Sequence, residues 1–455
     1  MRILYITNGY KPHRWAGTET YTAALAEEMT KRGNQIEILC AGNWDRGDKY
    51  WMGITRDMQN GIPVRRLNLN WMKSPAPFRY LYQNPVIADY LHGLLDETKP
   101  DLVHVTSCET LSASVLHVVK ESGLPLILTL TDFWFLCPRI NLLHPDGHNC
   151  TGRTTPVECL DCKMRDNRVY RAAKKIVPNG LLHPVMELVS HEPRWTRVRG
   201  LRGLVGDMAE RKTMLSHALT LPDLVVTASN FVRDVFVLNR VNIPIVVKPY
   251  GNDLSWLKSY KGKSESNVIR FGFIGQIFHA KGVHILLEAL AMIPPALQQK
   301  FLLVIYGSMG LDSTYSERVK DLASRYPNVS FEGTYPHAET AQIFSNVDVL
   351  IVPSLWYDFP LIIQEAFATQ TPVIATNLAG MAEVVEHEKS GLLFERGNAK
   401  ELAIQIQRIM NEPGLLNNLS RGVPEVMSIQ NHVEYFKKIY EQVVQNNRDK
   451  RGIQV

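Results

Sequence analysis

One carboxylate stands where a parallel sheet would place a ligand-binding group. Glu365 lies in an apolar helix pattern, 361–369, between two β-branched runs at 348–353 and 371–376. Ligands of open α/β sheets bind beyond the carboxyl ends of strands, where helix N-termini offer N–H groups to anions. The segment WYDFP, 356–360, opens onto this helix, so we expect it to bind phosphate and sugar groups. The alternative is an ordinary βαβ connection with Glu365 as a solvated charge.

One lysine is placed to reach an anion. Lys281 is the next-to-last residue of the segment GQIFHAKG, 275–282, which follows a strand-like run and contains a glycine turn. From such a position an ammonium group can contact a diphosphate. A lysine in a loop is otherwise usually solvated, and that reading stays open.

Four cysteines have the spacing of a metal site. They follow the pattern C-x(12)-C-x(8)-C-x(2)-C within 26 residues and are Cys137, Cys150, Cys159 and Cys162. Thiolates that converge from loops suit a tetrahedral metal, so a structural zinc ion is the first expectation. Unligated thiols, a disulfide and an iron–sulfur cluster are the alternatives. His144 or His148 could replace one cysteine as ligand.

Alternating strand and helix patterns must position these groups. Strands are predicted at 2–8, 35–40, 101–105, 124–130, 224–228, 243–247, 268–274, 301–306, 329–333, 348–353, 371–376 and 391–394. Helices are predicted at 19–32, 111–120, 283–291, 361–369, 400–410 and 431–446. The alternation indicates two doubly wound α/β domains, 1–250 and 251–425, with an insertion at about 132–221.

Two apolar faces follow from helical spacing. In the first predicted helix they are Tyr21, Leu25 and Met29, and in the last they are Tyr435, Ile439 and Val443.

Length and composition are those of an ordinary globular protein. A chain of 455 residues is too long for a single hydrophobic core, and 45% of its residues are hydrophobic. The start, MRILYITNGY, lacks the features of a signal peptide, and no apolar run is long enough to span a membrane. We therefore expect a cytoplasmic protein.

Basic residues concentrate in one region. Residues 163–212 hold 12 Lys and Arg against 5 Asp and Glu, although the whole chain carries only +5. Such a region suits an anionic membrane surface or an acidic ligand, with a solvated surface as the alternative. No nucleic-acid-binding motif accompanies it, so no nucleic acid partner is expected. The sequence also contains no P-loop, HExxH or complete G-x-G-x-x-G.

The longest motifs resemble those of one enzyme family. They are the glycine loop before Glu19, the segment 249–253, Gly275 with Lys281-Gly282, PSLWYDFPLIIQEAFA at 353–368, TPVIAT at 371–376 and GMAEVV at 380–385. Together they resemble the retaining family-4 glycosyltransferases of the GT-B fold. The segment 131–162 is similar to cysteine-bearing variants among bacterial polysaccharide and O-antigen enzymes.

The resemblance implies a fold and a set of site residues. Two Rossmann-like domains would face each other across a cleft, and the C-terminal helix, 426–455, would cross back to the N-terminal domain. Glu365 would hold the ribose hydroxyls and Lys281 the diphosphate, while N–H groups at 360–362 would face the donor. The implied donor-binding set is Gly17, Thr131, Gly275, Gln276, Lys281, Tyr335, Pro360, Leu361, Ile362 and Glu365. The implied catalytic set is Lys281, Glu365 and Asp358.

Three positions depart from the family pattern. Where the family has a second glutamate, eight residues before Glu365, this chain has Tyr357, and the nearest acid is Asp358. Gln276 replaces an arginine, and Thr131 replaces a histidine. His104 is a possible substitute for that histidine, with a core position as the alternative.

The implied activity is transfer of a hexose, with glucose as the first expectation, from a UDP-sugar to a glycan or polyprenyl-linked acceptor. No catalytic cofactor is needed, and the basic region would hold the enzyme at the inner face of the plasma membrane. The alternatives are a non-catalytic sugar-nucleotide-binding partner subunit and a GT-B sugar-nucleotide epimerase.

Overall fold

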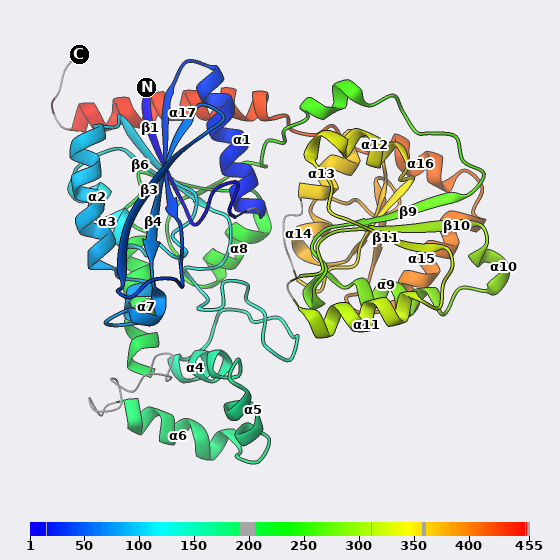
Figure 1. Ribbon diagram of the computed structural model, residues 1–455, viewed down its shortest axis with the longest axis horizontal. Helices are drawn as coiled ribbons and strands as arrows, with labels where there is room; N and C mark the ends of the chain where they lie inside the picture. Colours follow the sequence, from blue (N-terminus) through cyan, green and yellow to red (C-terminus); the bar gives the residue numbers. More distant parts are fainter. Residues whose placement is uncertain (15, 191–204, 311, 357–360, 451, 453–455) are drawn as a thin grey trace. The chain divides into compact units, whose positions relative to one another are not determined.

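The chain folds into two compact units. The computed structural model describes residues 1–14, 16–190, 205–310, 312–356, 361–450 and 452 (Figure 1). One unit consists of Met1–Gly251 with Ile429–Val455, and the other of Asn252–Ser428. The last helix therefore belongs to the N-terminal unit, although it follows the C-terminal unit in the sequence.

An eight-stranded sheet forms the centre of the N-terminal unit, in the order β3-β4-β2-β1-β5-β6-β7-β8. Only β3 runs antiparallel to its neighbour within this sheet. The strands are β1 (Arg2–Thr7), β2 (Gln35–Ala41), β3 (Trp51–Gln59), β4 (Ile62–Leu69), β5 (Leu102–Val105), β6 (Leu126–Leu130), β7 (Leu224–Thr227) and β8 (Ile245–Val247). The strand order reverses between β1 and β5, which is where doubly wound sheets bind ligands.

Helices cover this sheet with apolar faces. They are α1 (Gly17–Lys31), α2 (Pro85–Thr98), α3 (Ser114–Glu121) and α8 (Asn230–Leu238). On α1 the predicted residues Tyr21, Leu25 and Met29 are buried, which confirms that face. Strands β1, β5 and β6 are almost wholly buried because helices cover a parallel sheet on both sides.

An insertion separates β6 from β7. After the loop 131–155 it forms α4 (Pro156–Met164), α5 (Arg168–Lys174), α6 (Asn179–Ser190) and α7 (Val205–Ala218). Helix α4 packs against α6 and α7. Residues 191–204 of the basic region lie outside the described residues.

A six-stranded, wholly parallel sheet forms the C-terminal unit, in the order β11-β10-β9-β12-β13-β14. The strands are β9 (Ile269–Ile274), β10 (Phe301–Tyr306), β11 (Val329–Gly333), β12 (Val349–Val352), β13 (Val373–Thr376) and β14 (Gly391–Phe394). The helices are α9 (Val283–Leu290), α10 (Pro295–Gln298), α11 (Ser313–Ala323), α12 (Thr340–Ser345), α13 (Leu361–Ala368), α14 (Ala379–Ala382), α15 (Ala399–Asn411) and α16 (Leu415–Arg421). Here the order reverses between β9 and β12, so both sheets are doubly wound.

Helix α17 (Ile429–Lys450) packs against α1 along the N-terminal unit (Figure 1). The predicted apolar face was wrong by one position. Phe436, Tyr440 and Val444 are buried, whereas Tyr435, Ile439 and Val443 are only partly buried. The error arises because polar side chains on the true face bond inside the core: His432 Nε2 lies 3.1 Å from the Tyr21 hydroxyl.

His104 is a core histidine rather than a ligand-facing one. Its side chain is fully buried, with Nδ1 2.5 Å from the Tyr440 hydroxyl and Nε2 2.7 Å from Thr129 Oγ1. Burial lowers the pKa of His104 to about 3, so the imidazole is neutral. The histidine therefore joins β5, β6 and α17 and does not substitute for Thr131.

None of the helices that the structure describes combines the length and apolar character needed to cross a bilayer.

The true face of α17 can be tested by two neighbouring substitutions. Phe436→Ala should lower the free energy of unfolding of the N-terminal unit by about 3–5 kcal/mol, because a large buried ring is removed. The control Tyr435→Ala should cost less than about 1.5 kcal/mol, since it mainly removes a cation–π contact with Lys248. Denaturant unfolding measures both, and equal losses would contradict the assigned face.

Candidate functional site

Three loops interlock at the carboxyl ends of β9, β10 and β12. A Cβ on Gly282 would lie 1.9 Å from the Pro353 carbonyl oxygen, and one on Gly307 would lie 1.8 Å from the Gly275 carbonyl oxygen. Only glycine allows this approach, and Gly282 also has a φ of +73°. Leu355 N–H donates to the Ala280 carbonyl at 2.8 Å. The loops therefore form one rigid platform at the reversal point of the C-terminal sheet.

The platform holds the predicted lysine. Lys281 ends a 3₁₀ turn, His279–Lys281, directly before the αL residue Gly282. Its Nζ lies 5.7 Å from the centre of the Trp356 ring, which belongs to the loop after β12. Gln276 lies in the same loop with its side chain exposed. The structure thus places Gly275, Gln276 and Lys281 on one loop. This loop contacts Leu355 and Trp356, which follow β12.

Glu365 lies on α13 in a partly accessible but densely packed setting. Burial raises the pKa of Glu365 to about 7, and the negative charge of Asp253 adds to the rise. Burial raises the pKa of Tyr335, and the charge of Glu365 adds to the rise. The Tyr335 ring packs edge-on against Tyr306 at 5.4 Å. The predicted residues Tyr335 and Glu365 thus lie in the same unit and influence each other electrostatically.

The segment before α13 is only partly described. Leu361 and Ile362 form the first helical turn, whose N–H groups have no partner within a helix. The predicted residues Asp358 and Pro360, like Tyr357, lie outside the described residues. The one-residue difference from the family pattern therefore stays untested.

Two predicted residues belong to the N-terminal unit. Gly17 opens α1, is exposed, and a Cβ there would meet no atom within 4 Å. No internal contact of the unit explains a glycine at this position. Thr131 follows β6, and its hydroxyl donates to the Thr106 carbonyl at 3.0 Å, which fixes the loop after the strand.

A carboxylate cluster near the β1–β5 reversal point was not predicted. Glu109 follows β5 and accepts a hydrogen bond from the Asn8 side chain at 3.0 Å. Arg14 lies 3.7 Å from both Glu109 and Glu19. Asp132 follows β6 and accepts from the Trp134 N–H at 2.7 Å. The signal that could have found the cluster is an acid after each of two adjacent buried strands.

This cluster perturbs Asp132. Burial, together with the charges of Glu109 and Glu19, raises the pKa of Asp132 to about 7, although the Trp134 N–H and Arg211 oppose the rise. A carboxyl group that titrates near neutrality can accept or donate a proton at working pH.

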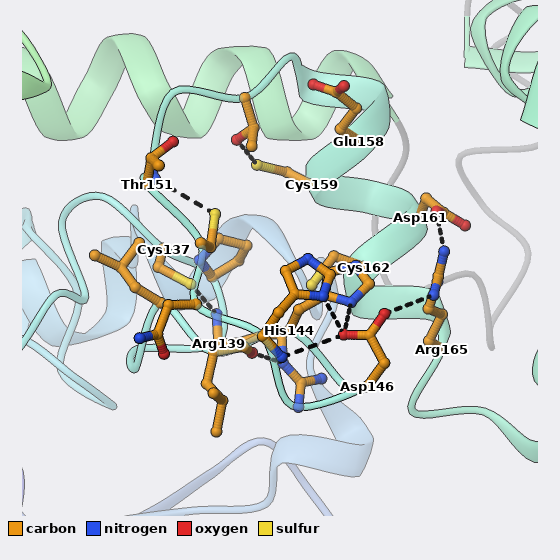
Figure 2. A pocket seen from close by; sticks show the side chains of 18 of the residues that line it. Cys137, Arg139, His144, Asp146, Thr151, Glu158, Cys159, Asp161, Cys162 and Arg165 are labelled. Carbon is orange, nitrogen blue, oxygen red and sulfur yellow. Dashed lines mark hydrogen bonds and ion pairs between the residues drawn. The ribbon is translucent and has the colours of Figure 1, made fainter. Parts of the chain in front are cut away.

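The four cysteines and their neighbouring histidines line one cavity of about 430 Å³ in the insertion (Figure 2). Cys137 and Cys150 come from the loop after β6, and Cys159 and Cys162 from α4. The predicted set is therefore gathered at one place within the N-terminal unit.

The raised pKa of Glu365 predicts how the stability of the protein changes with pH. Its raised pKa means that the folded state loses stability relative to the unfolded state as pH rises from about 4.5 to 7. Glu365→Gln removes this titration, so the variant should gain about 1–3 kcal/mol relative to wild type between pH 5 and pH 8. Paired denaturant unfolding at both pH values measures the difference. A pH-independent difference would show that Glu365 ionises normally.

Sequence comparisons match both units to transferases. A family model described as Glycosyl transferase 4-like domain matches residues 16–251, which is more than half of the chain. A second, described as Glycosyl transferases group 1, matches residues 257–425.

The curated relatives align over part of the chain. An uncharacterised glycosyltransferase of Methanocaldococcus jannaschii is 26% identical over 173 residues, 37% of this chain and 44% of the relative. The capsular polysaccharide biosynthesis glycosyltransferase CapM of Staphylococcus aureus is 27% identical over 152 residues, 33% of this chain and 39% of the relative. The chain thus spans less than half the length of these relatives.

Solved structures resemble the chain over nearly its whole length. A glycosyltransferase of Rickettsia africae has a TM-score of 0.63 at 16% identity, covering 98% of this chain and 99% of that one. The Anabaena protein HepE in complex with UDP-glucose has a TM-score of 0.58 at 16% identity, covering 98% and 99%. These likenesses show a GT-B fold built from two Rossmann-like domains. The chain belongs to the glycosyltransferase 4-like family.

Proposed function

We propose that the chain transfers a hexose from a UDP-sugar, with UDP-glucose as the first candidate, to a glycan or polyprenyl-linked acceptor. The observation that carries the proposal is the platform at the β9–β12 reversal point, where Lys281 is tied to the segment that opens α13 and Glu365. The structural likeness to HepE bound to UDP-glucose supports the donor class.

In this proposal the nucleotide is held at two ends. Glu365, once ionised, accepts hydrogen bonds from the two ribose hydroxyls, which replaces the solvation that the carboxylate loses on burial. Lys281 and the N–H groups of Leu361 and Ile362 face the diphosphate, whose charge suits a helix N-terminus. Gly275 and Gln276 lie on the same loop as Lys281, and Tyr335 is proposed to contact the donor as well.

Catalysis would be electrostatic and would proceed with retention of configuration. As the glycosidic bond breaks, negative charge grows on the leaving diphosphate, and Lys281 with the first turn of α13 stabilises it. The diphosphate then takes the proton of the acceptor hydroxyl. Asp358 is proposed to contact the sugar hydroxyls, and Gly17 to let backbone N–H groups approach the diphosphate.

The acceptor would be bound by the N-terminal unit. Asp132 and Glu109 are suited to accept hydrogen bonds from acceptor hydroxyls, because sugar hydroxyl groups donate to carboxylates. Thr131 is proposed to face the donor sugar from the same loop.

A non-catalytic sugar-nucleotide-binding subunit is the second candidate, favoured by Gln276 in place of a basic residue. A donor screen with UDP-glucose, UDP-galactose, UDP-GlcNAc and GDP-mannose separates the two. Slow hydrolysis or transfer of one donor supports the enzyme, whereas binding of donors without turnover supports the subunit. An epimerase would instead convert the donor sugar without releasing nucleotide.

The nucleotide contacts can be tested on UDP alone. Lys281→Ala and Glu365→Ala should each weaken UDP binding by about 1–3 kcal/mol, because each removes a charged contact to the bound nucleotide. The control Lys300→Ala removes an exposed lysine at the opposite, amino end of β10 and should bind UDP normally. Isothermal titration calorimetry measures the three. Unchanged affinity in both site variants would remove the assignment.

We also propose peripheral contact with an anionic membrane through α5 and α6. Leu181, Val185 and Leu188 are exposed at helical spacing on α6, and Ile176 is 84% exposed just before it. The neighbouring basic side chains Arg168, Arg171 and Lys175 are exposed as well. Apolar and basic groups side by side are typical of helices that lie in a lipid interface.

This surface predicts vesicle binding. The triple variant Leu181→Ser, Val185→Ser and Leu188→Ser should bind vesicles containing anionic lipid at least about tenfold more weakly than wild type, because three apolar side chains are lost. Met58→Ser, which removes a 60%-exposed apolar side chain from β3, is the control. Co-sedimentation of wild type and triple variant to the same extent would contradict the contact.

A further inference from the structure

The middle of the insertion, from residue 143 to the end of α6, has almost no apolar core of its own. Between residues 143 and 190, Leu160 is the one apolar side chain that is buried among those the structure describes. Asp161 is buried beside it, 2.9 Å from Lys174 Nζ and 2.6 Å from the Tyr170 hydroxyl. Small modules that bury so little usually depend on a disulfide or a metal to hold them together.

The four thiols lie where a cross-link of this kind would be needed. Two come from the loop that leaves the β-sheet and two from α4, so a bond between the pairs would join the insertion to the sheet domain (Figure 2). None of the six cysteines, all of which the structure describes, forms a disulfide.

Backbone and side-chain donors already face the sulfurs. The N–H of Arg139 points to Cys137 Sγ at 3.4 Å, and that of Gly152 to Cys150 Sγ at 3.3 Å, each two residues further along the chain. Thr154 Oγ1 lies 2.9 Å from Cys159 Sγ. Gly152 adopts a φ of +77°, which a turn of this kind requires. Hydrogen bonds to sulfur stabilise thiolates and tune metal–sulfur centres.

A buried positive charge lies near the four thiols. Arg211 on α7 is only 5% exposed and donates hydrogen bonds to the carbonyl groups of Trp134 and Cys137. Four thiolates around one divalent ion carry a net charge of about −2, so a buried guanidinium beside them lowers the cost of forming the centre.

We propose that Cys137, Cys150, Cys159 and Cys162 bind one metal centre, either a zinc ion or an iron–sulfur cluster, that fastens the insertion to the N-terminal sheet. This goes beyond the proposed transfer reaction, because the centre acts on structure and touches no substrate group. His144 and His148 are not needed as ligands: each shares the carboxylate of Asp146, at 2.8 and 2.5 Å.

The spacing of the thiols bears on the metal. Among the described residues, the one group of three ligand side chains with donor atoms within 4.8 Å of one another is His144, Asp146 and His148, so no three sulfurs are that close. A tetrahedral zinc ion holds its sulfurs about 3.8 Å apart, as follows from Zn–S bonds of about 2.3 Å. In a [4Fe–4S] cluster each thiolate binds a different iron and the sulfurs stand wider. Binding of a zinc ion would therefore require the thiols to move closer together than they lie in the structure.

The test measures zinc, iron and acid-labile sulfide in the full chain purified without oxygen. The expected result is either about four irons with sulfide or roughly one zinc ion per chain, and the two readouts distinguish the metals. The double variant Cys159→Ser and Cys162→Ser should lose this metal, while Cys108→Ser, a buried cysteine outside the cavity, should retain it. A metal-free wild type, a disulfide between these cysteines, or full metal in the double variant would overturn the proposal.

A second readout does not depend on variants that fold. Removal of the metal from wild type with a chelator should speed trypsin cleavage at the exposed Arg168, Arg171 and Lys175 at least tenfold. Unchanged cleavage after complete metal loss would overturn the fastening role. UDP binding, measured on the same samples, should persist, which separates this result from the proposed function.

Discussion

The geometry of the candidate site depends on the contact between Gly282 and Pro353. With no Cβ, Gly282 lets the loop after β9 lie against the carbonyl group at the end of β12. The hydrogen bond from Leu355 N–H to the Ala280 carbonyl then fixes Lys281 relative to the segment that opens α13. Any larger residue would force these loops apart, and the Lys281 ammonium group would lose its place beside the Trp356 ring. A single steric constraint thus sets the position of Lys281 relative to the loop after β12.

Electrostatic strain accompanies this geometry. Glu365 in the C-terminal unit and Asp132 in the N-terminal unit both have a pKa raised to about 7, mainly by burial. Each carboxylate therefore reduces the stability of its unit at neutral pH, as groups reserved for ligand contact commonly do. A nucleotide that donates hydroxyl hydrogen bonds to Glu365 would reduce the cost of burying its charge. Glu365 would therefore affect both binding affinity and folding stability. The cysteine-lined cavity differs, because a metal bound there would serve the fold alone.

Much of the fold was predictable because parallel strands leave a strong apolar signal. The predicted ranges of β10 and β11 agree with the structure residue for residue. Lys281 and Glu365 were predicted as site residues because of their positions after strand ends. The hairpin of β3 and β4 was missed because β4 contains Arg65 and Arg66, which are buried through ion pairs with Glu97 and Asp57. The face of α17 was misassigned because His432 and Tyr440 have their polar atoms bonded inside the core. Side chains that satisfy one another in the folded state carry no apolar pattern in the sequence.

The most direct measurement is the crystal structure of the full chain with UDP. Ribose hydroxyl groups should lie within hydrogen-bonding distance of Glu365, and phosphate oxygens should lie between Lys281 Nζ and the first turn of α13. UDP bound elsewhere, or a complex in which Glu365 and Lys281 both fail to contact the nucleotide, would contradict it.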